Sequence, residues 1–182
     1  SEHPYIETVT FTENSSLFSL DSSVFSQNDL LTTVTLPPTL RNINNPLDRN
    51  PRFQGFELSG PNPFFNVVDG MLLNSQGYLI KAPNFFTNPV VMMDDSITRL
   101  LGGSLANSNA REIIFSETSR LEIVDSYAIW QGRSLESVVF PASLREFSED
   151  NFEFESRLES VTFRRSHNQN GSITTIIPTR TI

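Results

Sequence analysis

The chain has 182 residues, a length that suits one domain, and 37% of them are hydrophobic, which is enough to bury a core. Its formal net charge of −8 argues against a surface that follows nucleic-acid phosphates, and the absence of cysteine excludes disulfides, thiol catalysis and thiolate metal sites. The two histidines, His3 and His167, lie near opposite ends and leave little for histidine-based catalysis, and no apolar run is long enough to cross a bilayer.

One apolar pattern recurs along the chain. Segments that read apolar-x-x-apolar-x-apolar, with a shorter version at 90–93, lie at residues 6–11, 31–36, 53–58, 90–93, 110–115, 135–140 and 158–163. Within each segment the alternation turns residues such as Val34 and Leu36 inward and Thr35 outward. One such unit cannot bury its own apolar face, so the recurrence predicts a solenoid of about seven stacked units with a parallel sheet along one side.

The spacing between the units follows a rule. The last apolar residues of successive segments are 25, 22, 35, 22, 25 and 23 residues apart. After Phe11 and Phe115 the next apolar residues follow at six and nine positions, whereas after Leu36, Met93 and Phe140 they follow at four and seven. We therefore predict a β-rich α/β fold in which the second side of the solenoid consists of short turns, strands, or 3₁₀ or helical segments of two lengths.

The spacing of 35 residues contains an additional element. Two apolar runs in residues 64–73 and 78–83 are joined by the polar turn Asn74-Ser-Gln-Gly77. This pattern predicts an inserted β-hairpin over about 64–83. We expect it to project from one edge of the solenoid or extend its sheet, and not to form a stacked repeat.

The repeats resemble the BspA-like (Treponema pallidum-type) leucine-rich repeats of bacterial and protist surface proteins. The resemblance rests on Leu135-Glu-Ser-Val-Val-Phe-Pro-Ala-Ser-Leu144 and the similar segments that begin at Leu31 and Leu158, and the predicted hairpin is similar to a spacer common in that family. It covers about residues 5–165. The family often has a cysteine before the opening leucine, whereas this chain has Asn28, Asn109 and Gly132 near those positions.

The outward-facing row at the centre of the predicted sheet contains the candidate binding residues. In register, this row is Thr10, Thr35, Glu57, Met92, Ile114, Val139 and Thr162. Three consecutive apolar side chains in such a row predict a patch for a protein partner, whereas the alternatives are simple β-propensity or cover by another segment. The basic pair Arg164-Arg165 lies near the same strands. The predicted partner-binding set is therefore Met92, Ile114, Val139, Thr162, Arg164 and Arg165.

No catalytic, cofactor or metal site is predicted from the remaining motifs. His167 lies in a polar loop, and Gly102-Gly103 lacks the Lys-Ser/Thr of a phosphate loop. Asp94-Asp95 and Glu149-Asp150 lack calcium-loop spacing, and acids at strand ends usually face water. Asn14 and Asn170 match the N-glycosylation pattern, which matters only in a eukaryotic secretory pathway.

These observations lead to a functional expectation. We expect a non-enzymatic module at the cell surface or secreted, and the family resemblance implies adhesion to host cells, neighbouring cells or extracellular-matrix proteins. The alternative is an intracellular, cytoplasmic scaffold for protein–protein interaction, since solenoids of this kind serve both locations. We expect no nucleic-acid partner and no membrane insertion of this segment. Residues 1–182 are expected to form one solenoid domain, a fragment of a longer array.

Overall fold

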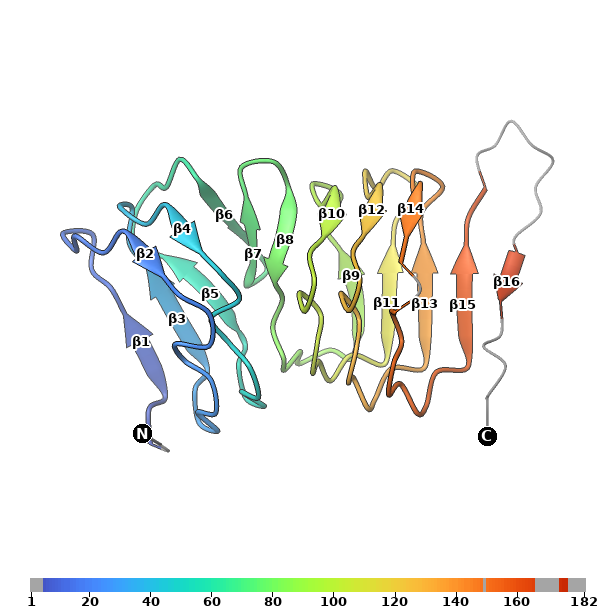
Figure 1. Ribbon diagram of the computed structural model, residues 1–182, viewed down its shortest axis with the longest axis horizontal. Coiled ribbons are helices and arrows are strands. Elements are labelled where there is room, and N and C mark those ends of the chain that lie inside the picture. Colours follow the sequence, from blue (N-terminus) through green and yellow to red (C-terminus); the bar gives the residue numbers. More distant parts are fainter. Residues whose placement is uncertain (1–4, 149, 166–173, 177–182) are drawn as a thin grey trace.

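The computed structural model describes residues 5–148, 150–165 and 174–176 and shows a solenoid whose strands lie side by side along its long axis (Figure 1). Strand β1 (Thr8–Thr10) lies at one end of the stack and β16 (Thr174–Ile176) at the other. The described ranges contain no helix, so the helical segments expected as one form of the second side are not found there. These segments are short and rich in Ser, Thr and Asn, whose side chains favour turns over helices.

The strands on the first side lie where the apolar pattern predicts them. The first sheet contains β1, β3 (Thr33–Leu36) and β5 (Gly55–Leu58) in parallel. The second contains the parallel strands β9 (Val90–Met93), β11 (Glu112–Phe115), β13 (Ser137–Phe140) and β15 (Ser160–Phe163), followed by the antiparallel β16. The pairing of Val34 with Phe56, and of Ile114 with Val139, confirms the predicted register within each sheet.

The expectation of one continuous sheet is wrong, because β5 and β9 belong to different sheets. The turn at Gly70 approaches β5 instead, and the Phe56 N–H donates to the Gly70 carbonyl at 2.9 Å. A Cβ atom on Gly55 would lie 2.5 Å from the Gly70 Cα, so this close approach requires glycine. The turn thus uses a backbone donor of β5 that pairing with β9 would have needed.

The segment predicted as one hairpin contains three antiparallel strands. These are β6 (Phe65–Val68), β7 (Met71–Asn74) and β8 (Tyr78–Lys81). The additional turn is Asp69-Gly70, and both residues have positive φ, 49° and 75°, as a two-residue hairpin turn of type I′ requires. An Asp-Gly pair is a strong hairpin signal, and this one lies inside the apolar run that was predicted to be a single strand of the hairpin.

This three-stranded segment does not protrude from the solenoid. Strand β8 pairs in parallel with β10 (Arg99–Leu100), so the segment extends the sheet on the second side. Met71, Leu72, Leu73 and Leu79 are all at most 2% exposed. The segment is buried because repeats pack against it from both directions, as its position between blue-green and yellow strands in Figure 1 illustrates.

The remaining strands of the second side have two residues each. They are β2 (Ser19–Leu20), β4 (Asn42–Ile43), β10, β12 (Ile123–Val124) and β14 (Glu146–Phe147). Hydroxyl and amide side chains connect these short elements: Thr39 and Ser143 each donate to two backbone carbonyls of the preceding repeat at 2.7–2.8 Å. Strands of two residues pair only a few of their backbone groups. Side chains of this kind donate hydrogen bonds to neighbouring backbone carbonyls that the short strands do not pair.

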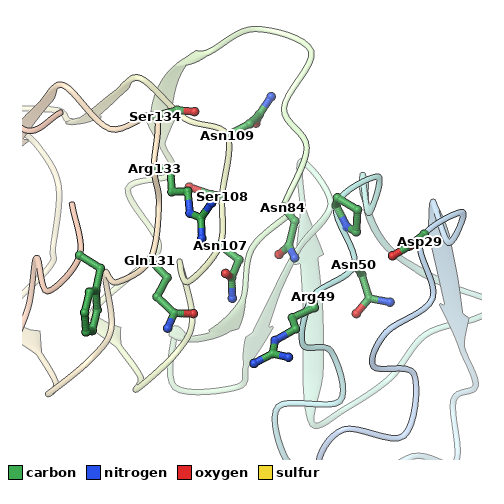
Figure 2. Close-up of a pocket in the computed structure, with 12 residues that line it drawn as sticks. Asp29, Arg49, Asn50, Asn84, Asn107, Ser108, Asn109, Gln131, Arg133 and Ser134 are labelled. Carbon is green, nitrogen blue, oxygen red and sulfur yellow. The ribbon is translucent and has the colours of Figure 1, made fainter. Parts of the chain in front are cut away.

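Return segments carry the chain from the second side back to the first. Residues 102–107 of one return segment form continuous turns, whereas residues 82–89, which follow β8, contain only bends. A cavity of about 640 Å³ lies beside this plainer return segment (Figure 2). Asn84 of this segment lines it together with residues of the return segments before and after it, among them Asn50 and Asn107. We call this space the loop cavity.

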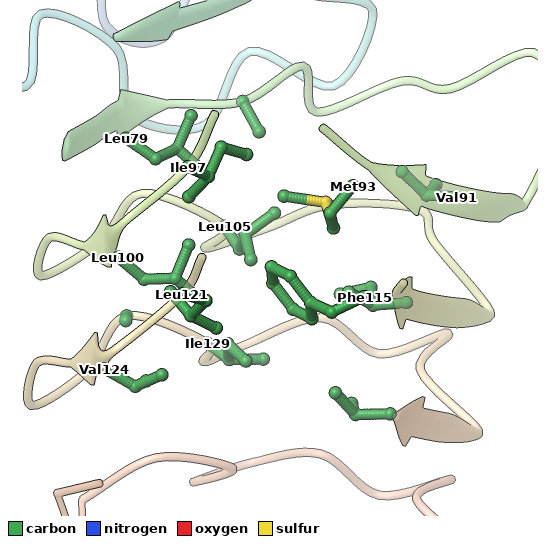
Figure 3. Close-up of a cluster of buried hydrophobic side chains, with 14 of the residues drawn as sticks. Leu79, Val91, Met93, Ile97, Leu100, Leu105, Phe115, Leu121, Val124 and Ile129 are labelled. Atoms are coloured by element: carbon green, nitrogen blue, oxygen red, sulfur yellow. The ribbon is translucent and has the colours of Figure 1, made fainter. Parts of the chain in front are cut away.

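The core consists of two hydrophobic clusters that meet at the inserted strands. Met71, Leu73 and Leu79 belong to the C-terminal cluster, part of which Figure 3 shows, whereas Leu72 and Ile80 belong to the N-terminal one. Aromatic rings stack from repeat to repeat in the C-terminal cluster. The centroid distances are 5.8 Å between Phe115 and Phe140 and 5.3 Å between Phe140 and Phe163. The predicted inward positions Val138, Phe140 and Val161 are buried, and Phe163 is partly buried.

Candidate functional site

The predicted apolar row lies on the outer face of the second sheet. Met92 pairs with Ile114, Ile114 with Val139, and Val139 with Thr162, so four neighbouring strands contribute one residue each. Met92 is 57% exposed, and the other three are partly exposed. Neighbouring strands are about 4.8 Å apart, so these side chains form one continuous stripe, which we call the sheet stripe.

The stripe does not continue onto the first sheet. Thr35 pairs with Glu57, and the Thr35 hydroxyl lies 3.4 Å from the Glu57 carboxylate. Because β5 does not pair with β9, the polar row on β1, β3 and β5 is separated from Met92. The seven-residue row therefore divides into a polar part and a largely apolar part at the gap between the sheets.

Additional apolar side chains extend the sheet stripe at its β9 end. Val90 lies two residues before Met92 on the same face and is exposed, and Phe85 is exposed in the return segment before it. Phe85, Val90 and Met92 line a small cavity of about 320 Å³ at the gap between the two sheets. Val90 is not among the predicted binding residues, although the alternation along β9 places it on the same face as Met92. Phe85 lies outside any strand pattern, and no periodic signal marks it.

The two arginines lie beyond the end of β15. The Arg164 guanidinium donates to the Phe115 carbonyl at 2.6 Å, and its backbone N–H donates to the Phe140 carbonyl at 3.1 Å. Arg164 therefore crosses the ends of two preceding strands and holds them, and its side chain is partly buried. Arg165 is exposed. The structure thus brings Met92, Ile114, Val139 and Thr162 together, whereas Arg164 is bound mainly to its own sheet.

Two acidic side chains next to the sheet, Asp95 and Glu136, have local partners. The Ser116 and Thr118 hydroxyls donate to the Asp95 carboxylate, and these hydrogen bonds lower the pKa of Asp95. Arg111 forms a two-point ion pair with Glu136 at 2.8 and 2.9 Å, which lowers the pKa of Glu136. Within the part of the chain that the structure describes, no group of three His, Asp or Glu side chains lies close enough to hold a metal ion.

The candidates set aside at the sequence level lie apart from the sheet stripe. Gly102 and Gly103 belong to a turn in the return segment after β10, and Asn14 is exposed in the turn after β1. His3, His167, Glu149 and Asn170 lie outside the described residues. Among residues 5–148 and 150–165, no helix has the length and apolar character needed to cross a membrane.

Comparison with solved structures identifies the same architecture elsewhere. The chain superimposes on the pneumococcal vaccine antigen PcpA with a TM-score of 0.64 and 21% identity, over 84% of this chain and 44% of that protein. A leucine-rich repeat protein from Eubacterium ventriosum gives a TM-score of 0.59 and 13% identity, over 81% and 43%. This chain therefore spans less than half the length of either protein. No relative was found among curated proteins.

The family follows from the sequence match. The description "BspA type Leucine rich repeat region" matches the chain in six copies, over residues 2–51 and 87–174. The unmatched interval, 52–86, contains β5 and the inserted strands β6, β7 and β8. The family match thus stops where the repeat changes from a simple strand-and-return unit to an antiparallel insertion. The chain belongs to the BspA-type leucine-rich repeat family.

Proposed function

We propose that the chain is a recognition module that binds a protein partner through the sheet stripe. The observation that carries this proposal is the register of Met92, Ile114 and Val139, which places one exposed and two partly exposed apolar side chains on adjacent strands. Outward positions on the first sheet are polar, so the apolar character is specific to one half of the solenoid. Contiguous apolar surface on a rigid sheet marks an interaction site, because its burial against a partner is favourable.

The flank of the stripe at β15 has the polar character of an interface rim. Thr162 continues the row on β15, and Arg164 and Arg165 follow that strand. Phe85 and Val90 add apolar area at the opposite end, where the gap between the sheets offers a recess for a partner side chain. An apolar centre with a polar rim is the usual anatomy of a protein-binding surface. Arg164 would act chiefly by positioning the strand ends that support this surface.

We propose a location at the cell surface or outside the cell for this module. Family membership and the likeness to a protein described as a vaccine antigen support this location. The partner would then be a protein of a host cell, a neighbouring cell or the extracellular matrix. The same stripe would serve an intracellular scaffold equally well, so the location has to be tested separately from binding.

The binding test replaces the stripe by the residue type of its polar neighbours. The triple substitution Met92→Thr, Ile114→Thr and Val139→Thr keeps β-propensity and removes the apolar area. Adhesion of the native and substituted proteins to epithelial cells and to an immobilised basement-membrane extract is measured, and we expect at least a tenfold loss of binding. Circular dichroism and a melting curve establish that the variant is folded.

A matched control removes exposed apolar area elsewhere on the molecule. Phe18→Thr with Val24→Thr serves this purpose, because both side chains are about half exposed and lie far from β9 in the chain. The control should bind like the native protein. If the folded triple variant also binds like the native protein, the site lies elsewhere on the molecule and the proposal is wrong.

A further inference from the structure

A second candidate site, independent of the sheet stripe, lies on the return-segment side of the solenoid. The loop cavity, about 640 Å³ in volume, is lined mostly by residues with polar side chains, namely amides, serines, two arginines and Asp29, together with Pro51 and Phe154 (Figure 2). Its volume falls within the range of small-molecule sites, about 300–1,000 Å³, but those sites are usually apolar. A cavity of this size with a polar lining calls for a polar ligand.

The strongest evidence for a ligand is the Asn84 side chain. Asn84 is only 2% exposed, yet neither its amide oxygen nor its amide nitrogen has a hydrogen-bond partner. Asn50 and Asn109, on the neighbouring return segments, both donate to backbone carbonyls, Asn50 to Phe25 and Asn109 to Phe86. A buried amide without partners destabilises the fold, because the hydrogen bonds that it makes with water in the unfolded chain are not replaced. Asn84 therefore has hydrogen-bonding capacity that the protein itself does not use.

Asn84 lies at the point where the regular packing of return segments is interrupted. Residues 82–89 lack the turns that fill this space in the return segment after it. The Asn84 backbone is fully engaged, because its N–H donates to the Phe53 carbonyl at 2.9 Å and its carbonyl accepts from the Asn109 N–H at 2.8 Å. Only the amide group of the Asn84 side chain has no hydrogen-bond partner. The buried Asn50 amide oxygen, on the same cavity wall, is also without a partner.

The charges around the cavity favour an anionic ligand. Arg49 and Arg133 line it together with one acid, Asp29. Arg133 forms no ion pair with any described residue, whereas Arg49 lies 3.7 Å from Asp48. An adjoining cavity contains Lys81, whose burial lowers its pKa to about 8. Asp29 and Asp48 thus offset the charges of the two arginines, and Arg133 is the guanidinium that has no ion pair of its own to compete with a ligand carboxylate.

An aromatic side chain completes the lining. Phe154 lines the loop cavity, is 70% exposed, and has a φ of 63°, a left-handed conformation that is rare for a bulky residue. Gln27, Asn107 and Gln131 of other return segments also have a positive φ, so this conformation belongs to the turns of the repeat, and here it places a phenyl ring at the cavity. The exposed ring offers a flat apolar surface beside the amides and arginines.

From these groups we infer that the loop cavity binds a saccharide that carries a carboxylate. Amide side chains both donate and accept, as sugar hydroxyls do, a guanidinium matches a carboxylate, and an aromatic ring matches the apolar face of a pyranose. Asn50, Asn84 and Gln131 would bind hydroxyls, Arg133 would bind the carboxylate, and Phe154 would cover the ring. This site shares no residue with the sheet stripe, so its failure would leave the proposed function untouched.

The test compares two sugars that differ at C6, where one has a carboxylate and the other a neutral hydroxymethyl group. Methyl glucuronide and methyl glucoside are titrated into the full chain by isothermal titration calorimetry. The fluorescence of Trp130, the single tryptophan, gives a second readout, since Trp130 lines the adjoining cavity that shares Arg49, Asn107 and Gln131 with this one. We expect saturable binding of the glucuronide with a Kd on the order of 1 mM, at least tenfold tighter than that of the glucoside.

Three variants and one control assign the residues. Arg133→Gln should remove the preference for the glucuronide, and Phe154→Ala should weaken both sugars while leaving the fold intact, since Phe154 is exposed. Asn84→Leu should weaken glucuronide binding at least tenfold without lowering the melting temperature, because the amide has no partner to lose. Arg145→Gln, an exposed arginine outside the cavity lining, should bind like the native protein.

Several results would overturn the inference. They are the absence of saturable binding of the glucuronide up to about 20 mM, equal affinity for the two sugars, and unchanged binding by Arg133→Gln. A lower melting temperature of Asn84→Leu with unaltered sugar binding would show that Asn84 has only a structural role. A tripeptide with a free C-terminal carboxylate forms the last arm, and tighter binding of this peptide than of the glucuronide would exclude a sugar as the ligand.

Discussion

Phe140→Ala tests the repeat register more directly than any other substitution. Phe140 is fully buried and stacks between Phe115 and Phe163, at 5.8 and 5.3 Å between ring centroids. Phe147 contacts the same ring edge-on at 5.3 Å. The substitution therefore removes a side chain that links three consecutive strands, β11, β13 and β15, to the second side of the solenoid.

The expected magnitude follows from these contacts. A buried Phe→Ala substitution costs about 3–5 kcal/mol, and each aromatic pair adds about 0.5–1.5 kcal/mol beyond buried area. Phe140 has three close ring partners, so we expect a loss in the upper part of that range, about 4–5 kcal/mol. With a urea m-value of about 2 kcal/mol/M, the denaturation midpoint should fall by about 2 M.

The measurement is urea denaturation followed by circular dichroism and by Trp130 fluorescence. Two probes are needed because a repeat protein can lose cooperativity when one interface between repeats is weakened. Phe154→Ala is the matched control: it removes the same atoms from a 70% exposed position and should change the free energy of unfolding by less than about 1 kcal/mol. A loss below about 1 kcal/mol for Phe140→Ala would refute the stacked register.

Three further outcomes are expected from the fold. Deleting residues 64–83 with a short Gly-Ser link should abolish cooperative unfolding, because these strands contribute to both core clusters; a cooperative transition in circular dichroism would contradict this. Gly55→Ala should lower the melting temperature in a thermal scan, because the new Cβ would collide with the Gly70 backbone, whereas an unchanged value would mean that this contact is loose. Burial raises the pKa of Glu155 to about 7, so Glu155 is protonated in the folded state over a range where the unfolded chain is ionised. The contribution of Glu155 to stability should therefore be fully present below about pH 4.5 and fall by about 1–2 kcal/mol as pH rises to about 7, after allowance for partial exposure. Glu155→Gln retains an acceptor for the Gly132 N–H and should flatten this pH dependence of the urea midpoint.

The strands and their faces were predictable because they depend on local alternation. Val34, Ile113 and Val138 are buried and their neighbours face outward, as a period of two residues requires. The sheet stripe was predictable for the same reason, since Met92 and Ile114 each precede an inward residue by one position. Its extension to Phe85 was not predictable, because that residue belongs to an irregular return segment.

The position of the inserted strands depended on contacts that no local pattern records. Each apolar run in 64–83 is compatible with a projecting hairpin or with a buried one. Burial follows from the pairing of β8 with β10 and from the approach of Gly70 to Gly55, residues that are distant in the chain. The same approach separates the two sheets; the spacing of 35 residues marks an irregular unit at this point but does not indicate that the sheet breaks there.

By itself, the sequence determined the repeat, the inward and outward faces, and the family, because these properties follow from periodic short-range patterns of apolar residues. Only the tertiary structure decided where the sheet breaks, which repeats share a core, and that the Asn84 amide is buried without a partner. Each of these depends on how one irregular unit packs between regular neighbours. Packing is a property of residues far apart in the chain, so a break in the pattern identifies the irregular unit and leaves its contacts undetermined.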